Sequence, residues 1–172
     1  MTPRDFGRIA AQTAKQVVTQ RIREAERGLI YNAFIDKEDD IVTGLVQRQD
    51  MRNIYIDLGK IEAVLPLSEL MPGEKFKQSE RIKAYITKVE NTTKGPQIML
   101  SRSHPGLLKR LFELEVPEIF DGVVEIRSVA REAGFRSKIA VYSRNPEVDP
   151  VGSCVGPRGT RVQTIVTELR GE

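Results

Sequence analysis

The stretch that decides the fold is PVGSCVGPRGTRVQTIVTEL, residues 150–169. Pro150 follows an aspartate and suits the first position of a short helix, which Gly156 should end. From Val162 onward, apolar residues recur at helical spacing, so a second helix is expected over residues 160–169. The stretch therefore predicts two helices joined by a glycine-bounded turn of four residues: Gly156, Pro157, Arg158 and Gly159.

This turn has the chemistry of a phosphate-binding loop. A G-x-x-G sequence lets the backbone approach an anion without interference from Cβ atoms. The helix that follows presents free N–H groups and the positive end of its dipole. Arg158 and Arg161 add cations, and the sequence places no acid beside them. The alternative is a structural link whose glycines only permit the bend. Its setting between two helices favours RNA binding.

The residues before this stretch complete one unit over 105–172. A helix is expected over 107–114, and two strands over 123–130 and 138–143, joined by a turn at Gly134. Between residues 127 and 161 there are seven basic residues and three acidic ones. This local excess predicts that further cations help the turn to hold RNA. The candidates are Arg127, Arg136 and Lys138.

Upstream, over residues 40–102, the hydrophobic period changes from 3.6 to 2. Five short strands separated by turn residues within about sixty positions predict a small closed β-barrel. The expected strands cover residues 41–46, 53–58, 63–67, 81–89 and 97–101, and one of the expected turns covers residues 94–96.

One face of this barrel alternates cations with aromatics. Over residues 81–87, isoleucines and an alanine point one way, while Arg81, Lys83 and Tyr85 point the other. Tyr55 also points away from the apolar side of its strand. Such faces hold phosphates and stack bases. Arg81, Lys83 and Tyr55 are therefore RNA-binding candidates, and an ordinary solvated strand face is the alternative.

Residues 2 to about 36 are expected to form one long helix. Thr2 can cap it and Pro3 suits its first turn. An apolar stripe runs along it at helical spacing from Phe6 to Ala33. Two interpretations are open: a connector that packs partly on its neighbour, or the end of a preceding domain.

Composition narrows the function classes. The net charge is only +3, so nucleic-acid binding has to be argued from local clusters. The single cysteine, Cys154, and the lack of any apolar run of about 20 residues indicate a soluble cytoplasmic protein. The only histidine, His104, has no catalytic partners, and no Cys/His cluster is present. We expect no enzyme activity, no metal and no cofactor.

Several motifs resemble known families. Segment 40–102 resembles an S1-like OB domain, and segment 105–172 resembles a type II K-homology (KH) domain, whose loop clamps about four nucleotides. Together with the opening Thr-Pro-Arg-Asp-Phe, this order is similar to the NusA family of bacterial transcription factors. The motifs that carry the resemblance are Gly44-Leu-Val46, Asn53-Ile-Tyr-Ile-Asp-Leu-Gly59, Leu67-Ser-Glu-Leu70, Ile98-Met-Leu-Ser-Arg102, Arg102-Ser-His-Pro-Gly106, Lys138-Ile-Ala-Val-Tyr-Ser143 and Val155-Gly-Pro-Arg-Gly159.

The resemblance implies a multi-domain α+β chain with three units. These are a connector helix from a polymerase-binding domain at 1–38, an OB-type barrel at 39–102, and a type II KH domain at 105–172 that lacks its last strand. A sheet without that strand has an unpaired edge, which predicts a mobile third unit or pairing with another chain. One departure is Pro66, where the S1 pattern often has histidine; it weakens the case for RNA stacking on that face.

The implied function is regulation of transcription through nascent RNA. The resemblance implies that the parent protein modulates pausing, termination and antitermination. It implies RNA polymerase, the transcript and other antitermination factors as partners, no membrane, and a monomer, with association through the open sheet as the alternative. One rival is a polymerase-docking scaffold with negligible RNA affinity. Another is a ribonuclease accessory module, whose catalytic core the sequence does not show.

Overall fold

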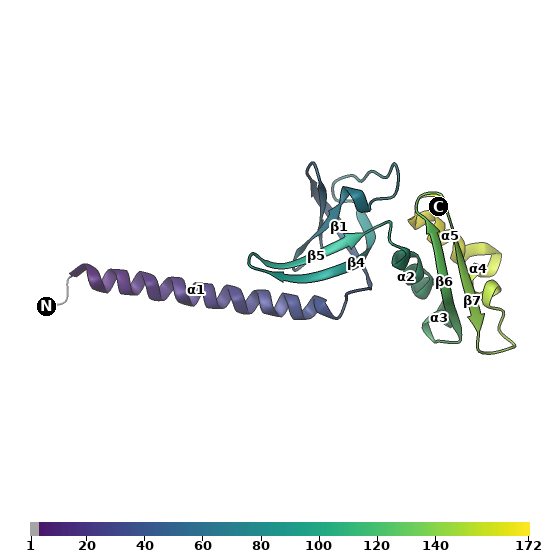
Figure 1. Ribbon diagram of the computed structural model, residues 1–172, viewed down its shortest axis with the longest axis horizontal. Coiled ribbons are helices and arrows are strands. Elements are labelled where there is room, and N and C mark those ends of the chain that lie inside the picture. The colour runs from purple at the N-terminus through teal and green to yellow at the C-terminus, as the bar shows by residue number, and fades with distance from the viewer. Residues whose placement is uncertain (1–3) are drawn as a thin grey trace.

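The computed structural model describes residues 4–172, so the expected helix cap at Thr2 and Pro3 lies outside the described residues. The chain runs from a long helix through a barrel into a helix-and-sheet unit (Figure 1). Helix α1, Arg4–Ile35, is exposed over most of its length. Only its last turns reach the barrel, where Phe34 is buried and Ile30 and Tyr31 pack beside it.

The middle unit is the predicted closed barrel, with strand order β1-β2-β3-β5-β4. All neighbouring pairs are antiparallel except β3 and β5. Its core is the alternating apolar set that the sequence indicated, including Ile54, Ile56 and Ile86. The strands are β1 (Ile41–Gln49), β2 (Asn53–Asp57), β3 (Glu62–Pro66), β4 (Arg81–Thr92) and β5 (Gly95–Ser101).

One close approach between barrel strands depends on a glycine. At Gly44 on β1, a Cβ atom would collide with Cγ2 of Ile56, so only glycine lets the strands approach there. The turn expected over residues 94–96 was placed too late. Gly95 and Pro96 already belong to β5, because β4 continues to Thr92 and pairs with Gly95.

The third unit follows the predicted order of helix, strand, strand, helix, glycine-bounded turn and helix. Asp149 caps α4, its side chain accepting a hydrogen bond from the N–H of Val151. The short helix α3 was not predicted; Pro117 ends α2 and also opens α3. The elements are α2 (Pro105–Glu115), α3 (Pro117–Phe120), β6 (Val124–Glu132), β7 (Arg136–Ser143), α4 (Pro150–Val155) and α5 (Thr160–Glu168).

Strands β6 and β7 form a two-stranded antiparallel sheet. Ile126 and Val129 of β6, with Ile139 and Val141 of β7, pack against the buried core of α2, α4 and α5. The helices therefore cover one face of this sheet and leave the other in solvent. Among residues 4–172, each of the two strands has one edge without a partner strand.

The barrel and the third unit share a packed junction. Tyr85, expected on a solvated face, is only 6% exposed, because α2 and the preceding loop cover it. Its hydroxyl donates to the Asp39 carboxylate at 2.8 Å, and its ring stacks on His104 with centroids 4.5 Å apart. Burial, together with the bond to Asp39, raises the pKa of Tyr85 to about 12.

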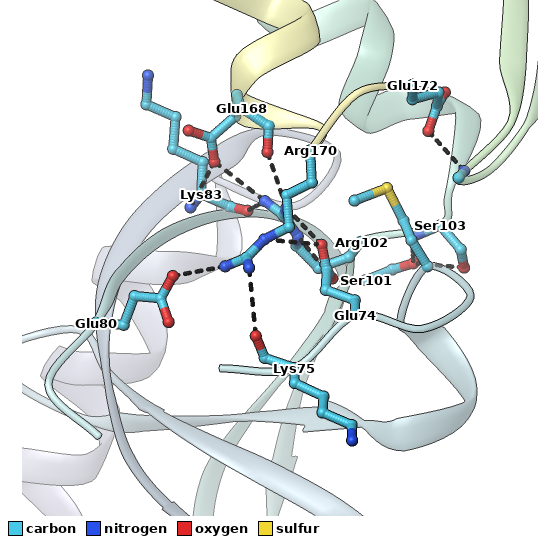
Figure 2. Close-up of polar contacts among 12 residues, drawn as sticks. Glu74, Lys75, Glu80, Lys83, Ser101, Arg102, Ser103, Glu168, Arg170 and Glu172 are labelled. Atoms are coloured by element: carbon cyan, nitrogen blue, oxygen red, sulfur yellow. Dashed lines mark hydrogen bonds and ion pairs between the residues drawn. The ribbon is translucent and has the colours of Figure 1, made fainter. Parts of the chain in front are cut away.

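Arg102 holds the junction together (Figure 2). Its side chain is 1% exposed, and its five N–H groups all find acceptors. Two bonds reach the buried Glu74 carboxylate, at 3.2 and 2.8 Å. Two more reach the carboxylate and carbonyl of Glu168 on α5, and one reaches the carbonyl of Lys83 on β4. One guanidinium thus ties α5 to the barrel.

A second buried pair holds the end of the chain. The side chains of Arg131 and Glu172 are 0% and 1% exposed, and Nε of Arg131 lies 3.0 Å from Oε1 of Glu172. The Glu172 carboxylate also accepts bonds from the Gly134 N–H and the Ser137 hydroxyl. Burial alone would raise the pKa of Glu172, but these donors together lower it. The last residue is therefore an ordered part of the third unit.

Candidate nucleic-acid interface

The glycine-bounded loop has a backbone that few residues tolerate. Gly156 has φ 76° and ψ 175°, a region open essentially to glycine alone, and Gly159 has φ 74°. A Cβ at Gly156 would lie 2.6 Å from Cγ of Arg161. Between the glycines, Arg158 is exposed with a left-handed φ of 55°. The loop therefore presents a cation and bare backbone to solvent.

Helix α5 begins directly after this loop at Thr160. Its first turn brings unpaired N–H groups and the positive end of the helix dipole to the same place. Arg158 takes part in no ion pair among residues 4–172, so its charge is available to an anion. Bare backbone, a helix start and a free cation together suit a phosphate group.

Arg161 differs from expectation. The sequence places no acid near it, but α3 brings Glu118 within 2.8 Å of its guanidinium. The same nitrogen donates to the carbonyl of Ser153 at 2.7 Å. Arg161 is therefore a paired side chain that links the start of α5 to α3 and α4. The acid lies 43 positions away in the chain, so no local pattern reveals it.

Arg127, Arg136 and Lys138 lie away from the loop. Arg136 and Lys138 alternate with Ser137 and Ile139, which face the helices, so both point to the outer side of the sheet. Arg127 lies over the ring of Tyr142 on that same side. Arg127 lies at the Tyr142 end of this face, and Arg136 and Lys138 lie toward its other end. Arg136 also lines a groove of about 220 Å³ with Val162 and Val166 of α5.

The RNA-binding candidates on the barrel lie on two strands that are not neighbours. On β2, Tyr55 is half-buried, with its hydroxyl bonded to Asp50 and the Arg48 guanidinium 3.9 Å from its ring centroid. Arg81 and Lys83 lie on β4, which is separated from β2 by β1. Lys83 is half-buried beside α5, and its N–H bonds to Glu168. Arg48, which the sequence reasoning missed, is the cross-strand neighbour of Tyr55.

A wide polar groove of about 1030 Å³ lies elsewhere, between α1 and the β4–β5 hairpin. Its cations are Lys15, Arg23 and Arg27, and amide and hydroxyl side chains line much of the rest. None of the RNA-binding residues predicted from the sequence lines this groove. Helical spacing along α1 could have indicated which polar residues share the groove side of the helix, but not that the β4–β5 hairpin lies beside them.

Other chemistry is scarce in the part of the chain that the structure describes. There, no three His, Cys, Asp or Glu side chains gather closely enough to bind a metal ion. Cys154 is buried in the core of the third unit, and burial raises the pKa of its thiol. None of the helices within residues 4–172 has the length and apolar character to cross a membrane.

Three family models match the chain in sequence. Residues 1–28 match the NusA N-terminal domain, residues 35–101 the S1 RNA binding domain, and residues 102–172 the NusA-like first KH domain. These matches follow the three structural regions: the long helix, the barrel, and the helix-and-sheet unit.

Curated relatives match over the whole chain. The transcription termination/antitermination protein NusA of Halalkalibacterium halodurans is 77% identical over all 172 residues, and that of Bacillus subtilis is 72% identical. The protein of the same name from Thermus thermophilus is 48% identical. The chain spans 45%, 46% and 45% of the lengths of these relatives. With its three regions matched in this order, the chain belongs to the NusA family.

Proposed function

We propose that this chain binds single-stranded RNA through the loop from Gly156 to Gly159. The observation that carries the proposal is the loop backbone, because its positive φ angles set an unpaired Arg158 in front of the start of α5. The glycines let the sugar-phosphate backbone approach, and Pro157 stiffens the loop. Phosphate contacts dominate such binding, so affinity falls steeply as salt rises.

The barrel adds a second, weaker contact. The stacked Arg48 and Tyr55 pair offers a flat surface to a base, and exposed Arg81 offers a charge to a phosphate. Lys83 contributes from the junction. Arg161 acts indirectly, by fixing the loop against α3 through Glu118.

The biological setting comes from the relatives, which are named transcription termination/antitermination proteins. The chain acts in that process on nascent RNA, with RNA polymerase and other antitermination factors as partners. It acts in the cytoplasm, as a monomer and without catalysis or a cofactor. Its working units are the connector helix 1–38, the barrel 39–102 and the KH unit 105–172.

A second candidate function rests on α1. Phe6, Ile9 and Leu29 are 59%, 61% and 72% exposed, an unusual apolar surface for a solvated helix. This surface favours docking of a protein, and a chain built for docking alone has negligible RNA affinity. RNA polymerase is the partner that this interpretation implies.

An RNA titration at two salt concentrations separates the two functions. We compare the native chain with Arg158→Asp and with the charge-matched control Lys109→Asp, which changes an exposed residue on α2. We expect Arg158→Asp to weaken binding about tenfold or more at low salt and to reduce the salt slope by about 1. Equal affinity in all three proteins would move RNA binding away from the loop. Negligible affinity in the native chain would favour the docking scaffold.

A further inference from the structure

The face of the β6–β7 sheet turned away from the helices, here the outer sheet face, is unoccupied by any element of residues 4–172. Its members are exposed and come from both strands in alternation with core residues. They are Arg127, Ser128, Ala130 and Glu132 on β6, and Arg136, Lys138, Ala140 and Tyr142 on β7, with the half-buried Glu125 opposite Tyr142.

One end of the outer sheet face is a flat, cationic stack. Tyr142 is 50% exposed, and the guanidinium of Arg127 lies 4.7 Å from its ring centroid. Glu125 pairs with both Arg127 and Arg144, so one carboxylate serves two guanidinium groups and a positive charge remains. Aromatic rings and guanidinium planes are the two kinds of surface on which unpaired bases stack.

The middle of the outer sheet face is a low floor. Ala140 lies opposite Ser128, and Ala130 lies opposite Lys138, so no large side chain stands between the stack and the far end. An aromatic stack beside a floor of small residues leaves room for a planar base to lie against the sheet. A protein partner would instead need apolar side chains or charged pairs across this region.

The far end carries two cations. Lys138 and Arg136 are two residues apart on β7, roughly 7 Å along the strand. Neither takes part in an ion pair among residues 4–172, although Glu132 lies opposite Arg136. The neighbouring Arg131 points inward and is neutralised by Glu172. The available charge on this end is therefore positive, as a phosphate backbone requires.

We propose that the outer sheet face is a further binding surface for single-stranded RNA, separate from both the loop and the barrel. Bases stack on Arg127 and Tyr142, and phosphates contact Lys138 and Arg136. The inference rests on the proposed function only in taking RNA as the ligand, since no residue is shared with the loop. Because α4 and α5 lie on the opposite face, one RNA reaches both surfaces only by passing around an edge of the sheet. Long RNA therefore engages both surfaces, and short RNA engages the loop alone.

The chain contains no tryptophan, which provides a direct test. Tyr142→Trp places a single fluorescent indole on the outer sheet face, here the β7 reporter. The matched control is Phe120→Trp, the α3 reporter, at a residue 81% exposed at the end of α3. We expect an oligouridylate of about 20 nucleotides, longer than the usual single-module site, to quench the β7 reporter and leave the α3 reporter unchanged. An oligomer of about four nucleotides, the length one loop clamps, should leave the β7 reporter unchanged.

Affinity measurements complete the test. Tyr142→Ala and Lys138→Gln should each weaken long-RNA binding, the first about fivefold or more, without changing short-RNA binding. Arg158→Asp should reduce short-RNA binding, and saturating long RNA should still quench the β7 reporter in that background. If Arg158→Asp has no effect while the β7 reporter is still quenched, the loop proposal fails and the outer-face proposal stands.

The proposal is overturned if long RNA fails to quench the β7 reporter and binds Tyr142→Ala and Lys138→Gln as tightly as the native chain. A response of the β7 reporter to polyglutamate but not to RNA also overturns it and assigns the face to an acidic protein. Circular dichroism of each variant shows whether the unit is folded.

Discussion

Arginine side chains have opposite roles at the junction and on the outer surfaces of this molecule: at the junction they are buried and paired, and on the surface they are exposed and unpaired within residues 4–172. At the junction, Arg102 and Arg131 are almost fully buried and bound to carboxylates. On the surface, Arg158 and Arg136 are exposed and take part in no ion pair within the described residues. The first pair of arginines fixes how the units sit together. The second pair leaves charge available to a ligand.

The physical reason for the difference is desolvation. A guanidinium removed from water is tolerated only when acceptors satisfy its N–H groups and a carboxylate balances its charge. Arg102 meets both conditions with five hydrogen bonds. An exposed guanidinium keeps its water, so it is free to exchange that water for phosphate oxygens. Arginine content alone therefore says little about RNA affinity.

Arg102→Met should have the largest effect. It leaves Glu74 buried without its main partner and breaks the tie between α5 and the barrel, so we expect the free energy of unfolding to fall by about 3–5 kcal/mol. Urea denaturation measures the change. The control Arg136→Met, at an exposed residue, should change stability by less than about 0.5 kcal/mol. If both variants lost a similar free energy of unfolding, the proposed difference between junction and surface arginines would be wrong.

Glu172→Gln should come next, with a loss of about 2–3 kcal/mol at pH 7, because it leaves Arg131 buried without a counter-charge. The native pKa of Glu172 lies below its usual value of 4.5. Its contribution is therefore complete above about pH 4.5 and is lost as pH falls through the lowered pKa. The variant should show a shallower loss of stability on acidification than the native chain. Parallel pH profiles would contradict this.

Gly156→Ala should destabilise the third unit by about 2 kcal/mol, since alanine is strained at this φ and ψ. Its methyl group also meets the Arg161 side chain, which has to shift. Thermal unfolding measures the loss, and RNA titration should show weaker binding too. Gly122→Ala is a useful control, because φ is also positive there but a Cβ has open space. An equal loss in both variants would leave strain alone as the cause.

The smallest stability effects distinguish the two loop arginines. Arg161→Gln should cost about 1 kcal/mol of stability by breaking the contact with Glu118. Arg158→Gln should leave stability unchanged and reduce the salt slope of RNA binding by about 1. Calorimetry and RNA titration on both variants provide the comparison. The reverse pattern, with Arg161 controlling the salt slope, would restore the expectation drawn from the sequence.

The sequence predicted the barrel strands and most helices because these depend on local periodicity. Alternation marked Ile54 and Ile86 as core, and Asp149 marked the start of α4. The sequence also predicted the G-x-x-G loop, whose two glycines have positive φ angles. The mobility expected for an incomplete sheet is a prediction that hydrogen exchange over residues 105–172 can test.

The sequence failed where distant segments meet. Tyr85 was expected in solvent and is buried, because alternation shows which side of a strand a residue takes but not what covers that side. Arg161 was expected to be free and is paired with Glu118. Arg127, Arg136 and Lys138 were expected to help the loop because they fall within the basic excess over residues 127–161. They point to the face of the sheet turned away from the helical core, and their contact with RNA stays a prediction.

By itself, then, the sequence determined most of the elements, their order and the glycine-bounded turn between α4 and α5, since these follow from spacing and turn residues. The tertiary structure alone decided which charges are buried and which are free. That distinction depends on carboxylates brought from far along the chain, such as Glu74 and Glu168 to Arg102. A guanidinium that is buried beside a carboxylate has to pair with it, because an unpaired charge is not tolerated without water.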